Sequence, residues 1–154
     1  MNAGAIRFRD VTSASGDFGT PVEVSRALVF GDIDEDGDLD LLVTNTAGRV
    51  RLYRNDARKE GGWLLVRAFD RERKRDAHGA RVQVVAGGKS YLRLASPGYS
   101  YLSSNDPRAH FGLPGGVTIE RIDVMWPDGS RERFPGGATN RVVVVEKGAG
   151  RPGR

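Results

Sequence analysis

The chain has 154 residues, of which 38% are hydrophobic and 29% charged, and its formal net charge at pH 7 is +4; these values are typical of a soluble globular protein with one medium domain or two small ones. The sequence contains no cysteine, which excludes disulfide bonds and thiolate metal sites. No apolar run approaches the roughly 18 residues of a membrane-spanning helix, and the opening segment as given lacks the apolar stretch of a signal peptide.

Most of the chain is predicted to form β-strands. Short apolar runs rich in Val, Leu, Ile, Tyr and Trp alternate with clusters of Gly, Pro, Asn and Asp, and very little of the sequence shows helical periodicity. We therefore expect an all-β fold. In chain order, the predicted strands are 27–30, 39–44, 50–53, 63–69, 80–85, 90–95, 118–126, 132–134 and 141–146.

Two of these strands, 118–126 and 141–146, carry a more detailed prediction. The alternation in the strand 118–126 places Ile122, Val124 and Trp126 on its inward face. The Trp-Pro-Asp-Gly sequence at 126–129 predicts a turn and hence a hairpin, because proline presets one dihedral angle and glycine tolerates positive φ. The unbroken valine run at 142–145 predicts a strand that is covered on both faces.

An acidic loop lies between the first two predicted strands. The stretch 31–40, GDIDEDGDLD, holds six carboxylates in nine residues. Two unit charges about 4 Å apart repel by roughly 1 kcal/mol in water and by roughly 4 kcal/mol at the effective dielectric near a protein surface. So dense a cluster in a chain that is basic overall indicates that a cation lies among the carboxylates.

The spacing within the acidic loop favours Ca²⁺, which takes six to eight oxygen ligands. Alternate aspartates supply oxygens at loop positions 1, 3 and 5, and Gly37 at position 6 permits a sharp turn. A backbone carbonyl at position 7 and a carboxylate at position 9 complete the set. The predicted calcium ligands are Asp32, Asp34, Asp36, Asp38 (through its carbonyl) and Asp40.

Other interpretations of this loop fit less well. An EF-hand loop ends with glutamate at position 12 and is flanked by helices, whereas Val43 stands there and the flanks are strand-like. A phosphotransferase nucleophile motif needs Thr or Val where Asp36 stands. Mg²⁺ demands stricter octahedral geometry than Ca²⁺. A solvated hairpin loop without any metal is the remaining alternative.

Two units and two further segments are expected. Residues 1–56 carry the acidic loop, and residues 62–147 carry at least six predicted strands, enough for a small β-sandwich. The polar segment 57–61 is predicted to be a short linker between them. The glycine-rich tail 148–154 has no apolar anchor and is expected to be flexible.

The sequence favours a protein that is not an enzyme. His78 and His110 are far apart in the sequence, and each is expected to have a structural or surface role. The chain contains no Gly-x-Ser-x-Gly elbow, no phosphate-binding Gly-x-x-x-x-Gly-Lys-Ser/Thr loop and no dinucleotide fingerprint. The acidic-loop carboxylates would be kept ionised by a metal, so they would not serve as a general acid.

Positive charge is concentrated in the segment 67–81. Residues 51–81 hold ten basic side chains against five acidic ones, whereas residues 1–40 hold three against nine. Interleaved acids and few aromatic side chains favour a solvated loop over a nucleic-acid site. Binding of an anionic polysaccharide or a nucleic acid through this segment is retained as an alternative.

The expected partner is a protein or a carbohydrate, with nucleic acid disfavoured. Tyr99, Tyr101, Phe111 and Trp126 would be able to form a sugar-stacking face, but their strand spacing favours a hydrophobic core instead.

Two parts of the chain resemble known families. Residues 8–12 with Gly16, the acidic loop, and Leu-Tyr-Arg-Asn at 52–55 resemble one FG-GAP or VCBS repeat of a calcium-binding β-propeller. The downstream unit is similar to the ASPIC/UnbV domain that follows such repeats in cartilage acidic protein-like proteins. The residues that carry this second resemblance are Trp63-Leu64, His78-Gly79-Ala80-Arg81-Val82, Gly98-Tyr99-Ser100, His110-Phe111-Gly112-Leu113 and Trp126-Pro127-Asp128-Gly129.

The resemblance implies one propeller-blade-like β-hairpin unit with a calcium loop, packed on or linked to a small β-sandwich. It also implies a non-catalytic, calcium-stabilised binding or adhesion module in an extracellular or periplasmic location. Because a single blade cannot bury both of its faces, we expect the chain to be the C-terminal part of a larger repeat protein. The alternative is an accessory or processing protein of a biosynthetic cluster, since UnbV-type domains take their name from natural-product gene clusters.

Overall fold

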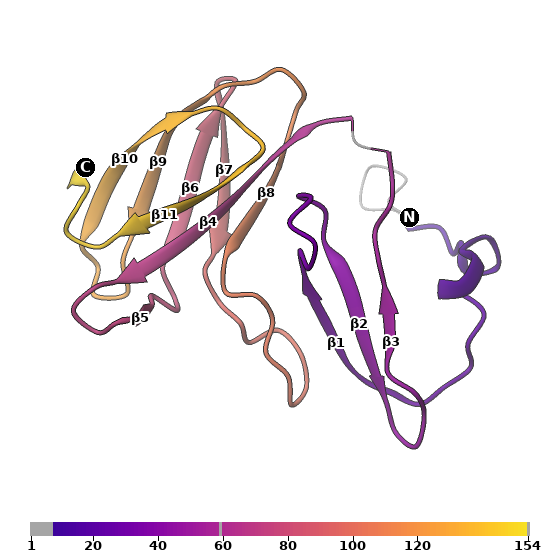
Figure 1. Ribbon diagram of the computed structural model, residues 1–154. Helices are drawn as coiled ribbons and strands as arrows, with labels where there is room; N and C mark the ends of the chain where they lie inside the picture. Colours follow the sequence, from indigo (N-terminus) through magenta and orange to yellow (C-terminus); the bar gives the residue numbers. More distant parts are fainter. Residues whose placement is uncertain (1–7, 59, 154) are drawn as a thin grey trace.

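The computed structural model describes residues 8–58 and 60–153, and it confirms the all-β prediction. Within these residues the main strands form three sheets, and two single 3₁₀ turns are the only helices (Figure 1). The elements are η1 (Thr12–Ala14), η2 (Gly16–Phe18), β1 (Ser25–Gly31), β2 (Asp40–Asn45), β3 (Arg51–Tyr53), β4 (Gly62–Asp70), β5 (Arg75–Asp76), β6 (Arg81–Ala86), β7 (Lys89–Leu94), β8 (Ala109–Leu113), β9 (Ile119–Met125), β10 (Arg131–Gly137), β11 (Arg141–Glu146) and β12 (Arg151–Pro152). Residues 1–7 of the first predicted unit, residue 59 of the predicted linker and residue 154 of the predicted tail lie outside the described residues.

The first unit is a three-stranded antiparallel sheet in the order β1-β2-β3. The acidic loop joins β1 to β2, and the pair Gly31 and Asp40 closes the ladder at the base of the loop. The Phe18 ring of η2 packs edge-on against Tyr53 of β3, with ring centroids 5.1 Å apart. The antiparallel ladder between β1 and β2 therefore holds the two ends of the acidic loop together.

The second unit is a β-sandwich. One sheet has the order β12-β10-β9-β6-β7, and the other has β11-β4-β5 with β8 also paired to β4. The β11–β4 pair is parallel, whereas the other pairs are antiparallel. Both sheets contribute to one buried cluster. It includes Leu64 of β4 and Phe111 of β8 from one sheet, Val84 of β6 and Ile122 of β9 from the other, and Trp126 directly after β9.

Several predicted details of this sandwich are confirmed. Ile122, Val124 and Trp126 are at most 2% exposed, as the alternation predicts. The turn between β9 and β10 is closed by the Gly129 N–H, which donates to the Trp126 carbonyl at 2.9 Å, and Gly129 has a φ of +86°. Local turn chemistry and strand alternation therefore determine this hairpin.

The valine run does not have both faces covered. Val142 and Val144 are 40% and 52% exposed, whereas Val145 is buried. The β11 strand pairs with β4, and its alternate residues Val142 and Val144 lie on the face that is turned to solvent. Valine favours strands because it is β-branched, whether or not both faces are buried, and the run therefore predicted the strand correctly and its burial wrongly.

The segment that was expected to be a flexible tail instead carries a strand. Arg151 and Pro152 pair with Arg133 and Glu132 of β10. The backbone N–H groups of the two glycines before this strand, at 148 and 150, both donate to the Glu132 carboxylate, at 2.8 and 2.9 Å. Hydrogen bonds to the edge of β10 therefore replace the apolar anchor that the tail lacks.

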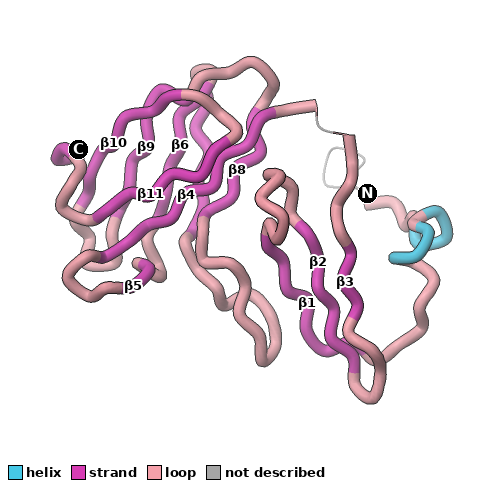
Figure 2. Tube along the Cα trace, viewed as in Figure 1, coloured by secondary structure: helices cyan, strands magenta, loops and turns pink. Residues whose placement is uncertain are grey.

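The two units are in contact. The long connection between β7 and β8 extends beside β1 (Figure 2), and its Asn105 side chain accepts a hydrogen bond from the Phe30 N–H at 2.8 Å. In the part of the chain that the structure describes, no helix is long and apolar enough to cross a membrane.

Candidate metal centre

Three carboxylates of the acidic loop converge. Asp32, Asp34 and Asp40 each place one carboxylate oxygen within 4.8 Å of the others. Asp32 and Asp40 are only 5% and 3% exposed, while Asp34 is exposed. Two of three mutually repelling groups are thus withheld from the solvent that would screen them.

Backbone hydrogen bonds fold the loop around two of these carboxylates. Asp32 accepts from the N–H groups of Asp36 and Gly37, at 3.0 and 2.9 Å. Asp40 accepts from the N–H of Ile33 at 3.0 Å and from that of Asn55, just beyond β3, at 2.8 Å. The carboxylates at the two ends of the loop are therefore fixed in place by the chain itself.

The other two predicted ligands are placed differently. Among the described residues, the convergent group does not include the carboxylate of Asp36, which accepts the Asp38 N–H at 2.9 Å. Asp38 was predicted to contribute its backbone carbonyl and not its carboxylate, so its side chain was not expected in the convergent group. The structure thus brings together three of the five predicted residues through their side chains.

The donor set fits a calcium ion. Ca²⁺ binds oxygens at about 2.3–2.6 Å, so two ligands on opposite sides of one ion are about 4.6–5.2 Å apart. The 4.8 Å limit on the spacing of the three carboxylate oxygens is compatible with that range. Gly37 has a φ of +96°, which supports the expectation that only glycine turns easily at this position.

Sequence reasoning did not identify the part of the second unit that adjoins this loop. The His110 Nε2 atom of β8 lies 2.7 Å from the Gly37 carbonyl oxygen. Trp63 of β4 lies against Gly37, where an added Cβ would overlap the indole. The Arg108 guanidinium lies 3.9 Å from the carboxylate of the exposed Glu35. A hydrogen bond with Asp106 raises the pKa of Arg108 above its usual value. Trp63 and His110 both stand in segments that carry the ASPIC/UnbV resemblance, and this resemblance was the sequence signal that could have identified them.

Three of the six Lys and Arg side chains in the segment 67–81 are paired with acids. The pairs are Arg67 with Asp76 at 2.6 Å, Arg71 with Glu146 at 2.9 Å, and Arg73 with Asp70 at 3.8 Å. The hydrogen bond with Asp76 raises the pKa of Arg67. These pairs reduce the positive field that the segment presents to an anionic partner.

The histidines and aromatic residues are distributed over several elements. His78 is exposed in the turn between β5 and β6, whereas His110 is half-buried on β8. Phe111 is 1% exposed, as is Trp126, so the core prediction is confirmed for both. Tyr99 and Tyr101 are 53% and 64% exposed, and the core prediction is wrong for these two residues of the β7–β8 connection.

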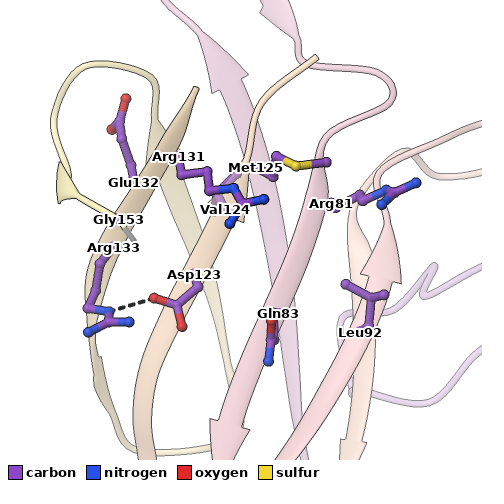
Figure 3. Close-up of a pocket in the computed structure, with 10 residues that line it drawn as sticks. All are labelled: Arg81, Gln83, Leu92, Asp123, Val124, Met125, Arg131, Glu132, Arg133 and Gly153. Carbon is purple, nitrogen blue, oxygen red and sulfur yellow. Dashed lines mark hydrogen bonds and ion pairs between the residues drawn. The ribbon is translucent and has the colours of Figure 1, made fainter. Parts of the chain in front are cut away.

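A separate hollow of about 270 Å³ lies on the outer face of β6, β9 and β10 (Figure 3). In it, Arg133 Nε donates to the Asp123 carboxylate at 2.6 Å, which Figure 3 draws as a dashed line. Gln83 of β6 lies opposite Asp123, and Arg81 lies farther along the same strand, opposite Met125. None of the five predicted calcium ligands lines this hollow, and the acidic loop remains the candidate site that the sequence and the geometry share.

Comparison with known proteins places the second unit in a family. Residues 70–152, more than half of the chain, match the family described as ASPIC and UnbV. Over 125 residues the chain is 36% identical to cartilage acidic protein 1 of Homo sapiens. The aligned part covers 76% of this chain and 18% of that protein. The Mus musculus protein of the same name is 36% identical over 107 residues, covering 66% of this chain and 16% of the relative. The chain thus spans less than a fifth of the length of the curated relatives that it matches.

Proposed function

The chain belongs to the ASPIC and UnbV family, and from that premise we propose that it is a non-catalytic, calcium-stabilised binding or adhesion module. The observation that carries the proposal is the convergence of Asp32, Asp34 and Asp40 within 4.8 Å, with two of the three buried. A divalent ion would neutralise this cluster and order the loop. The sandwich would then present its surface to a protein or carbohydrate partner.

The calcium ion would be held by residues of the acidic loop alone. Asp32, Asp34 and Asp40 would bind it through their carboxylates, with Asp36 as a further carboxylate ligand and Asp38 contributing its backbone carbonyl. The ion supplies positive charge and no reaction chemistry in this proposal. The hydrogen bonds that already hold Asp32 and Asp40 would lower the entropic cost of assembling the ligands.

Residues 1–56 would act as one FG-GAP or VCBS-like repeat of a larger protein. Three antiparallel strands with the acidic loop between the first two support this assignment. Leu28 and Leu52 of this sheet are 45% and 56% exposed, and Val50, just before β3, is 60% exposed. Neighbouring repeats would cover such apolar positions. An extracellular or periplasmic location would suit calcium sites of this kind, because extracellular modules bind Ca²⁺ at about 10⁻⁴–10⁻³ M.

The alternatives receive less support. Binding of a polyanion through the segment 67–81 would have to compete with the carboxylates that pair with Arg67, Arg71 and Arg73, half of the six Lys and Arg side chains there. An accessory or processing role in a biosynthetic cluster would rest on the family name alone.

The proposal is tested by thermal unfolding of the full chain in excess CaCl₂ and in EDTA. Calcium at one hundred times its Kd would stabilise the folded state by about 2.7 kcal/mol. For a chain of this size, that corresponds to a rise in Tm of about 5–10 °C. Asp34→Asn should abolish most of the rise, because Asp34 belongs to the convergent group, is exposed, and accepts none of the backbone hydrogen bonds that shape the described loop.

Glu35→Gln is the matched control, because it removes one negative charge from the same loop at a residue outside the convergent group. It should keep the calcium-dependent rise in Tm. Equal melting temperatures in calcium and EDTA for the wild-type chain would contradict the proposal. An equal loss of the rise in both variants would contradict the assignment of Asp34 as a ligand.

A further inference from the structure

The outer face of β4 and β8 is covered by the first unit. Leu64 and Val66 of β4 point into the sandwich core, which leaves Trp63 and Leu65 on the opposite face. Leu65 is nevertheless only 1% exposed and is not part of the core cluster. A cavity of about 220 Å³ is lined by Leu65 together with Phe30 and Leu39 of the first unit. The acidic-loop hairpin therefore buries an apolar face of the sandwich.

Two side chains of this face contact the turn of the acidic loop. On neighbouring strands, His110 pairs with Leu65 and Gly112 with Trp63, so Trp63 and His110 lie on the same side of the sheet. The indole occupies the space where a side chain of residue 37 would be, and His110 Nε2 lies 2.7 Å from the Gly37 carbonyl oxygen. Both contacts therefore involve the backbone of Gly37, Trp63 at its Cα and His110 at its carbonyl.

The β7–β8 connection holds the same hairpin from its edge. The Leu28 N–H donates to Ser100 Oγ at 3.0 Å, and the Phe30 N–H donates to Asn105 Oδ1 at 2.8 Å. Asn105 is 4% exposed, and its own side-chain amide donates to the Pro97 carbonyl at 3.1 Å. Phe30 also packs beside Tyr99, with ring centroids 5.8 Å apart. The β1 strand and the loop that follows it are therefore both attached to the second unit.

We propose that Trp63 and His110 are positioning residues for the acidic loop, so that calcium binding at the loop and docking of the loop onto the sandwich are linked. The inference rests on the proposed calcium function. If the docked loop has the conformation that binds the ion, contacts from the sandwich raise calcium affinity, and calcium in turn strengthens docking, because the coupling between two equilibria is reciprocal. The ASPIC/UnbV unit would then be the structural partner of the calcium repeat that precedes it.

The first test measures calcium affinity of the full chain by titration calorimetry. His110→Ala removes the contact to the Gly37 carbonyl while leaving every proposed ligand in place, and it should weaken calcium binding by at least about fivefold. His110→Gln should recover affinity, because an amide N–H is able to donate to the same carbonyl. His78→Ala is the matched control on an exposed turn and should bind calcium like the wild-type chain.

The second test uses tryptophan fluorescence. Trp63 lies against the loop, whereas Trp126 is 1% exposed in the sandwich core. Calcium should therefore change the emission of the wild-type chain, and Trp63→Phe should remove that change. This measurement does not depend on the folding of the His110 variants.

The outcomes separate this inference from the proposed function. Calcium binding to the wild-type chain without a change in Trp63 emission would overturn the linkage and leave the calcium site intact, as would unchanged affinity in His110→Ala. A wild-type chain that binds no calcium would overturn the site and the linkage together.

Discussion

Trp63 of the sandwich lies against Gly37 of the acidic loop so closely that a Cβ at position 37 would overlap its indole. Sequence reasoning assigned Gly37 to the loop because a sharp turn needs positive φ, and its φ of +96° agrees with that reason. The contact adds a second requirement, because the same glycine allows the loop to approach the second unit. A single residue thus serves both the turn and the packing between the two units.

Gly37→Ala should destabilise the chain more than a glycine replacement that only strains the backbone. Gly129→Ala is the control, because Gly129 has a similar φ of +86° and a Cβ there would meet open space. The overlap with Trp63 should add about 1–3 kcal/mol to the cost of backbone strain. Urea unfolding of both variants in EDTA measures this difference without any contribution from calcium. Equal losses would indicate that the loop does not pack on Trp63 in solution.

Leu65→Ala tests whether the first unit covers the outer face of β4. Leu65 is 1% exposed although it lies outside the sandwich core cluster, so its truncation should cost about 2–5 kcal/mol in unfolding free energy. Leu92→Ala, at a residue of β7 that is 57% exposed, should cost about 0.5 kcal/mol or less. Chemical denaturation provides both values. Similar small losses at the two positions would mean that the units separate and expose Leu65.

The Asp123 carboxylate should make stability depend on pH. Burial by itself would raise the pKa of Asp123, but hydrogen bonds from Arg133 and Arg121 outweigh it and hold the pKa below the usual value of 3.8. Because the pKa is lower in the folded state, the contribution to stability is fully present above about pH 4, where the unfolded carboxyl is also ionised, and is lost as pH falls through the folded pKa.

Asp123→Asn should therefore be less stable than the wild-type chain at pH 7, by about 1 kcal/mol or less because the pairs are partly exposed. The difference should shrink when urea unfolding is repeated at pH 3. Asp17→Asn, at an exposed residue of η2, controls for the loss of one carboxylate. A difference of the same size at both pH values would contradict the assigned role of the two arginine pairs.

Local patterns predicted most of the strands and the position of the candidate site. The alternation in β9, the Pro-Asp-Gly turn and the aspartate spacing each depend on residues within about ten positions, where side-chain chemistry acts directly on the backbone. For the same reason, the valine run predicted the β11 strand but not its exposed face. The neighbours that cover or expose a strand come from other parts of the chain.

The sequence alone was enough to establish an all-β chain with a dense aspartate loop between two strands, because those features follow from neighbouring residues. Which carboxylates meet, and what supports the loop, depended on the folded structure. His110 reaches Gly37 across 73 positions, Asn105 reaches Phe30 across 75, and β12 returns to the edge of β10. Such contacts leave no periodic pattern in the sequence, since they arise only when the sheets pack and bring distant segments together.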